Sequence, residues 1–185
     1  MADFESQAGR VRDGEALVAA LRERGVDYLA PSDAQGEPLA DETLLASLAA
    51  HDNPRLVQAL IALFMLHPQL APLVPPLRAR LGAPAEVELL AHYMAAVYLQ
   101  SMWRIRLDHY LPPTPDLPDY FSGELGLPSP DDEFGKAGLY ALADWHSAHA
   151  AGRANHLSEY EGVAALLLEQ IKLKARHVVS ASRQP

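Results

Sequence analysis

The sequence predicts an all-α protein, a single-domain helical bundle of about six helices around one long central helix. Apolar side chains recur at steps of three and four over long stretches, which is the spacing of one helix face. Alternating β-branched runs bounded by turns, which would predict strands, are missing. A hydrophobic fraction of 49% with 21% charged residues is typical of a folded chain. We therefore expect residues 1–185 to form one domain, frayed at 1–12 and 179–185.

The first 50 residues predict two short helices. Asp13 is a capping residue and Gly25 a stop signal, so one amphipathic helix is expected between them. Residues 26–40 are rich in Pro, Gly, Asp and Ser and predict a connector. A second helix is expected over 42–50.

A third helix begins at Asp52-Asn53-Pro54, where capping side chains directly precede a proline suited to the first turn. Its run 59–66 is apolar on every face, which predicts a helix surrounded by others. Four prolines follow between 68 and 76, so we expect only short turns up to Gly82.

The longest helix is expected from Pro84 to Leu111, where Pro112-Pro113 ends it. Two apolar rows run along it, which predicts burial on two sides and a central position. A third row, at steps of four, is mostly polar and faces either solvent or a site. It consists of Glu88, His92, Ala96, Gln100, Arg104 and Asp108.

Residues 112–134 form a long irregular segment, rich in proline and acidic residues, around Tyr120, Phe121 and Phe134. Such length without regular structure is uncommon inside compact domains. Three interpretations remain: cover for the bundle packed by its own aromatics, contact with a partner, or disorder.

Two further helices complete the prediction. One spans about 136–150 and carries Leu139, Leu142 and His146 on one face. The last opens at Ser158, which together with Glu161 has the spacing of a capping box.

Composition excludes several classes of function. Without cysteine, the chain has no disulfides, thiolate metal sites or thiol nucleophiles. A net charge of −9 argues against nucleic-acid binding, except to a specific RNA substrate. The N-terminus lacks the pattern of a signal peptide and no apolar run is long enough to span a membrane, so we expect a cytoplasmic location and no membrane contact. Phosphate-binding and dinucleotide motifs are missing, so no cofactor is expected.

Three histidines near the last helix–helix turn are a candidate metal site. His146 and His149 lie on adjacent turns, and His156 could fold back toward them to complete a nitrogen and oxygen ligand set. This predicts a metal-dependent hydrolase. In the alternative interpretation, the same histidines are solvated around a polar turn.

Arg104, His109 and Tyr110 are candidate catalytic residues. An Arg, four intervening residues, a His and a nearby Tyr resemble the motif of the HEPN family of helical bundle proteins. The resemblance implies a ribonuclease or toxin component, in which Arg and His from two subunits meet across a homodimer interface. In this chain the tyrosine follows the histidine directly, whereas closer family members have one residue between them. Alternatively, Arg104 pairs with Asp108 on the helix surface.

A broader resemblance extends over residues 41–175. The phrases Asp52 to Leu56, Ala96 to Gln100, Leu117 to Phe121 and Glu124 to Pro128 are similar to those of small bacterial helical proteins that accompany nucleotidyltransferases. This resemblance implies a nucleotidyltransferase partner.

The sequence as a whole favours a helical protein-interaction or regulatory module. Its partner surface would be the 112–134 segment with the adjacent central helix, because no enzyme signature is specific enough to name a reaction. The HEPN-like ribonuclease and the metal-dependent hydrolase are the alternatives.

Overall fold

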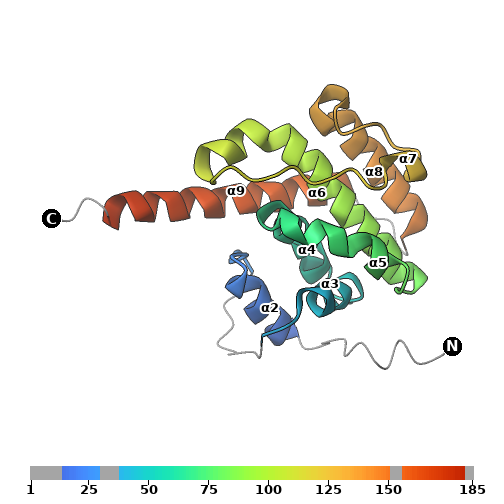
Figure 1. The fold of residues 1–185 in the computed structure, drawn as a ribbon, viewed down its shortest axis with the longest axis horizontal. Helices are drawn as coiled ribbons and strands as arrows, with labels where there is room; N and C mark the ends of the chain where they lie inside the picture. The colour runs from blue at the N-terminus through green and yellow to red at the C-terminus, as the bar shows by residue number, and fades with distance from the viewer. Residues whose placement is uncertain (1–13, 30–37, 151–155, 182–185) are drawn as a thin grey trace.

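The computed structural model describes residues 14–29, 38–150 and 156–181, and these contain helices and no strand (Figure 1). This confirms the all-α class. The elements are α2 (Gly14–Glu23), α3 (Asp41–Ala49), α4 (Pro54–Leu66), η1 (Pro68–Leu73), α5 (Val74–Arg78), α6 (Ala83–Tyr110), α7 (Ser122–Leu125), η2 (Asp132–Gly135), α8 (Lys136–His149) and α9 (His156–Ala181).

The central helix α6 is one unbroken rod of 28 residues. Every side chain from Leu89 to Gln100 is buried, because α3, α4, α5, α8 and α9 all pack around it. Figure 1 shows α6 crossing α9, whose C-terminal end extends beyond the other helices. The predicted central position of the longest helix is confirmed.

Helix α4 is the second core element. All residues from Ala59 to Met65 are buried, as the apolar run predicted, because α2, α3, α6 and α9 surround the helix. The predicted start is also confirmed: the Asn53 side chain accepts a hydrogen bond of 3.0 Å from the backbone N–H of Arg55, and Pro54 occupies the first turn.

The described residues contain eight α-helical segments rather than about six. The proline-rich stretch after α4 forms η1 and the short α5. Pro68 and Pro75 stand at the first positions of these helices, where a proline loses no hydrogen bond, whereas Pro72 lies inside η1. The last helix begins at His156, so Ser158 lies inside its first turn and not at its cap. Residues 179–181, expected to be frayed, belong to α9.

Several expectations fall outside the described residues. These are the frayed segment 1–12, the cap at Asp13, the central part of the 26–40 connector, and residues 182–185. The predicted stop at Gly25 is confirmed, because this residue has a φ of 82° and the N–H of Val26 reaches back 3.0 Å to the carbonyl of Leu21.

Residues 112–131, which we call the strap, run back along α6 and contain α7 (Figure 1). Proline carbonyls in such a segment have no helical partner and need a donor from elsewhere. Side chains of α6 supply these donors, which supports the interpretation of 112–134 as cover for the bundle. The bonds are Tyr93 Oη to Pro118 O (2.6 Å), Tyr98 Oη to Pro128 O (2.8 Å), Gln100 Nε2 to Pro115 O (3.1 Å) and Ser101 Oγ to Pro130 O (3.0 Å).

Among the described helices, none is individually long and apolar enough to cross a membrane. Only one pair, Pro54–Leu66 with Pro68–Arg78, meets the length and composition criteria together, and it is bent by 117°.

Candidate functional site

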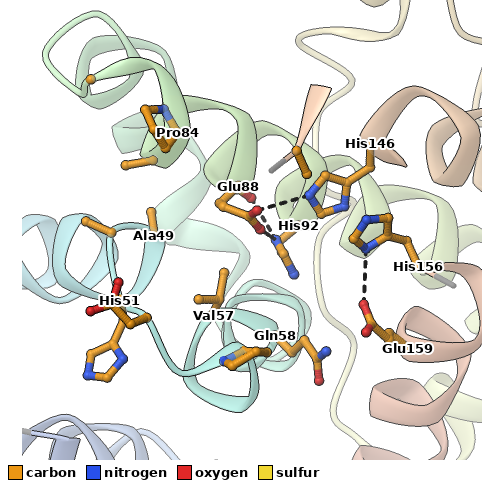
Figure 2. Close-up of a pocket in the computed structure, with 16 residues that line it drawn as sticks. Ala49, His51, Val57, Gln58, Pro84, Glu88, His92, His146, His156 and Glu159 are labelled. Atoms are coloured by element: carbon orange, nitrogen blue, oxygen red, sulfur yellow. Dashed lines mark hydrogen bonds and ion pairs between the residues drawn. The ribbon is translucent and has the colours of Figure 1, made fainter. Parts of the chain in front are cut away.

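A cavity of about 480 Å³ lies where the start of α6 meets the ends of α3 and α8 and the beginnings of α4 and α9 (Figure 2). Small apolar side chains line part of it, and histidines and carboxylates line the rest. We call the whole cavity the histidine pocket. Its polar lining residues are His51, Asp52, Gln58, Glu88, His92, His146, His156 and Glu159.

Glu88 and His92 enter the pocket from adjacent turns of α6. His92 is buried, and its Nδ1 lies 2.7 Å from the backbone carbonyl of Glu88. A carbonyl can only accept, so Nδ1 carries the hydrogen and Nε2 keeps its lone pair while the ring is neutral. Burial lowers the pKa of His92 to about 4, so the ring is neutral near pH 7.

His146 links α8 to both α6 and α9. Its Nδ1 lies 2.6 Å from the hydroxyl of Tyr160, and its Nε2 lies 3.3 Å from Oε1 of Glu88. Burial raises the pKa of Tyr160, so the hydroxyl keeps its proton and donates it to Nδ1. Because Nδ1 accepts this bond, Nε2 carries a ring hydrogen. Nε2 is close to Glu88 but is buried without a hydrogen-bond partner among the described residues.

Burial alone would raise the pKa of Glu88. The contact with His146 and the proximity of His92 and His156 outweigh that effect and hold the pKa below its ordinary value. Glu88 is therefore a carboxylate near neutral pH, at the centre of three imidazoles.

His156 stacks on His146, with ring centroids 3.8 Å apart and planes inclined by 24°. Its Nδ1 lies 3.1 Å from Oε2 of Glu159, and Nε2 is buried without a hydrogen-bond partner among the described residues. Burial and the neighbouring His146 lower the pKa of His156. The ring is thus neutral, with Nδ1 donating to Glu159 and a lone pair left on Nε2.

The structure brings together two of the three predicted metal ligands, His146 and His156. His149 is exposed, stacks on Trp145 at 4.5 Å and directs Nδ1 to the carbonyl of Trp145. Within the described parts of the chain, no three His, Asp or Glu side chains are placed to hold a metal ion. A zinc ligand nitrogen lies about 2.0–2.1 Å from the ion in the plane of its ring. Two stacked, nearly parallel rings cannot meet that condition at one ion.

A second hollow, of about 820 Å³, lies between the C-terminal half of α6 and the strap. We call it the strap groove. Its floor comes from α6 and its rim from the strap and η2. The lining residues are Val97, Gln100, Ser101, Met102, Arg104, Ile105, Asp116, Leu117, Asp119, Ser129, Pro130, Asp131 and Phe134.

The rim of the strap groove contains unusual backbone geometry. Glu133 and Phe134 both have positive φ, at 49° and 57°, which costs about 1–2 kcal/mol for each residue with a Cβ. Gly135 follows with a φ of 82°, so close to α6 that a Cβ on it would lie 2.6 Å from the carbonyl oxygen of Tyr98. The turn is therefore pressed against α6, while the Phe134 side chain is 81% exposed.

The structure does not bring the three candidate catalytic residues together in one site. Arg104 lines the strap groove and pairs with Asp116 of the strap, not with Asp108. His109 and Tyr110 are exposed, contact each other edge to face at 4.6 Å, and do not line that groove.

Sequence reasoning missed Glu88 and His92 as members of a site with His146 and His156. The available signal was the polar row of α6, because Glu88 and His92 of that row line the histidine pocket. Farther along the same row, Gln100 and Arg104 line the strap groove.

Comparisons with protein-family models, curated proteins and solved structures find no match to this chain. Function is therefore inferred from these two sites.

Proposed function

We propose that the chain is a helical interaction module that binds a basic, apolar-anchored segment of a cytoplasmic partner protein in the strap groove. The observation that carries the proposal is the exposure of Ile105 and Phe134 at this one groove. Their exposed fractions are 87% and 81%, the highest of the large apolar side chains in the described residues.

The exposure of Phe134 is energetically unfavourable unless another molecule covers this side chain. Covering one large apolar side chain contributes about 1.5–3 kcal/mol. Phe134 forgoes that contribution and also has a left-handed backbone, so the isolated chain gains nothing from its placement. Strained backbone of this kind clusters at sites of recognition.

Charge indicates the chemistry of the partner. The groove is lined by three aspartates, Asp116, Asp119 and Asp131, and by one cation, Arg104, which already pairs with Asp116. Excess negative charge around an apolar centre favours a partner segment with Lys or Arg flanking a large apolar residue. The resemblance of the chain to proteins that accompany nucleotidyltransferases makes such an enzyme the first partner to test.

The test compares affinity capture by the wild-type chain with that by Phe134→Asp and Ile105→Asp. Leu166→Asp is the matched control, because Leu166 is also a large apolar residue with an exposed side chain, 52% accessible, on α9 away from the groove. We expect both groove variants, but not the control, to lose the same protein from an extract of the source cells.

A synthetic peptide of the contacted segment should then bind the wild-type chain in fluorescence anisotropy. We expect its Kd to be about 30-fold higher for Phe134→Asp than for the wild-type chain. High salt should raise the Kd further, because it screens the charges of the groove and the peptide. Capture that survives both groove substitutions would refute the proposal. Size-exclusion chromatography with light scattering detects the other occupant, a second copy of the chain.

A further inference from the structure

We propose that the histidine pocket is a binding site for a small organic molecule with a primary ammonium group, held by Glu88, His92 and His156. This site is separate from the strap groove and does not depend on the function proposed for that groove.

The first argument is the charge of the lining. Among the described residues that line the pocket there are three carboxylates, Asp52, Glu88 and Glu159, and no lysine or arginine. Burial keeps His92 and His156 neutral, so they do not offset this charge. The described lining therefore favours a cation over an anion.

The second argument is the direction of the hydrogen bonds. His92 and His156 each use Nδ1–H internally, toward the Glu88 carbonyl and the Glu159 carboxylate, which leaves both Nε2 atoms as acceptors. Nε2 of His156 is buried without a hydrogen-bond partner among the described residues, although an unsatisfied buried polar atom costs about 1–3 kcal/mol. With the Glu88 carboxylate, the pocket offers three acceptor groups, and a primary ammonium has three N–H donors.

The third argument is size and shape. A volume of about 480 Å³ suits an organic ligand rather than a bare ion. Ala49, Pro54, Val57, Pro84 and Ala85 line the same cavity and would contact an apolar body. Figure 2 shows His146, His156 and Glu159 across the pocket from Ala49 and Pro84, with Glu88 and His92 between them. The stacked rings of His146 and His156 argue against a chelated metal, as described above.

The experiment uses benzylammonium as the probe at about pH 7.5, with benzyl alcohol and benzoate as neutral and anionic molecules of the same shape. Binding is measured by calorimetry and by long-range ¹H–¹⁵N spectra of the histidine rings. We expect Kd near or below about 1 mM for benzylammonium, with displacement of the Nε2 resonance of His156, and no binding of the other two probes.

Glu88→Gln should weaken benzylammonium binding at least about tenfold. Glu161→Gln, which removes the same charge from the exposed surface of α9, should leave the Kd unchanged. Because Glu88 also contacts His146, Glu159→Gln is a second variant, expected to weaken binding because it removes another of the three negative charges in the lining. Circular dichroism checks the fold of each variant.

Three results would overturn the proposal: no benzylammonium binding at about 10 mM, equal binding of benzyl alcohol, or equal loss in Glu161→Gln. Stoichiometric Zn²⁺ binding that shifts His146 and His156 together would replace it with a metal site.

Discussion

Gly138 of α8 lies directly against the ring of Tyr98 of α6, so closely that a Cβ on Gly138 would be 2.0 Å from Cε1 of that ring. The ring is fully buried and donates its hydroxyl hydrogen to Pro128 of the strap. The contact therefore ties α8, α6 and the strap together.

The first prediction is that Gly138→Ala destabilises the protein by about 2–3 kcal/mol, because Tyr98 cannot move without breaking its bond to the strap. Gly162→Ala is the control, since Gly162 is also helical but nothing lies within 4 Å of its Cβ position. That variant should gain about 1 kcal/mol. Urea unfolding measures both, and a stabilised Gly138→Ala would show that α8 packs differently.

The second prediction concerns Gln100, whose side chain both donates a hydrogen bond to the strap and accepts one from it. Its Nε2 donates to Pro115 O, and its Oε1 accepts from the N–H of Leu117 at 2.7 Å. Gln100→Leu leaves two backbone groups unpaired and should cost about 2–4 kcal/mol. Limited proteolysis with mass spectrometry should show earlier cleavage within 112–118.

Ser101→Ala, which removes a single bond to Pro130, is the comparison and should cost about 1 kcal/mol. Equal cleavage rates for wild type and Gln100→Leu would mean that the strap is held elsewhere.

The third prediction is a pH dependence from His92. Its pKa falls from 6.5 to about 4 on folding, so between these values the unfolded chain binds more protons than the folded one. Stability is therefore complete above pH 6.5 and decreases as the pH falls toward 4, by about 3 kcal/mol for this residue. The lowered pKa values of His156 and Glu88 act in the same direction.

Urea unfolding across this pH range should give a smaller slope for His92→Gln than for wild type. His149→Gln is the control, because His149 is exposed, and should keep the full slope. If His92→Gln and wild type lose the same free energy on acidification, His92 does not fold in its neutral form.

The fourth prediction separates the interaction module from a HEPN-like ribonuclease. The Arg104–Asp116 pair is partly exposed, so Arg104→Ala should cost less than about 1 kcal/mol. We expect the wild-type chain and the Arg104→Ala, His109→Ala double variant to behave alike toward fluorescent RNA. Cleavage by the wild-type chain that the double variant lacks, with unchanged circular dichroism, would instead favour the ribonuclease.

Helical periodicity was sufficient to predict the class, the long α6 and the buried α4, because each depends on local spacing and capping. The short helices η1 and α5 were missed since their prolines also fit irregular turns. Only part of the histidine pocket could be predicted: His146 and His156 were grouped as candidate ligands because they are close in sequence. Their partners Glu88 and His92 lie more than 50 positions earlier, and only the packing of α6 on α8 and α9 brings them close.

The most direct test of the interaction module is site-specific photo-crosslinking in cells of the source organism. A benzophenone amino acid is placed at Phe134, at Ile105 and, as the control, at Leu166. Our account predicts that the first two positions crosslink to the same partner, within a basic segment, and that Leu166 does not. Crosslinking equal to that from Leu166, or none from either groove position, would contradict it.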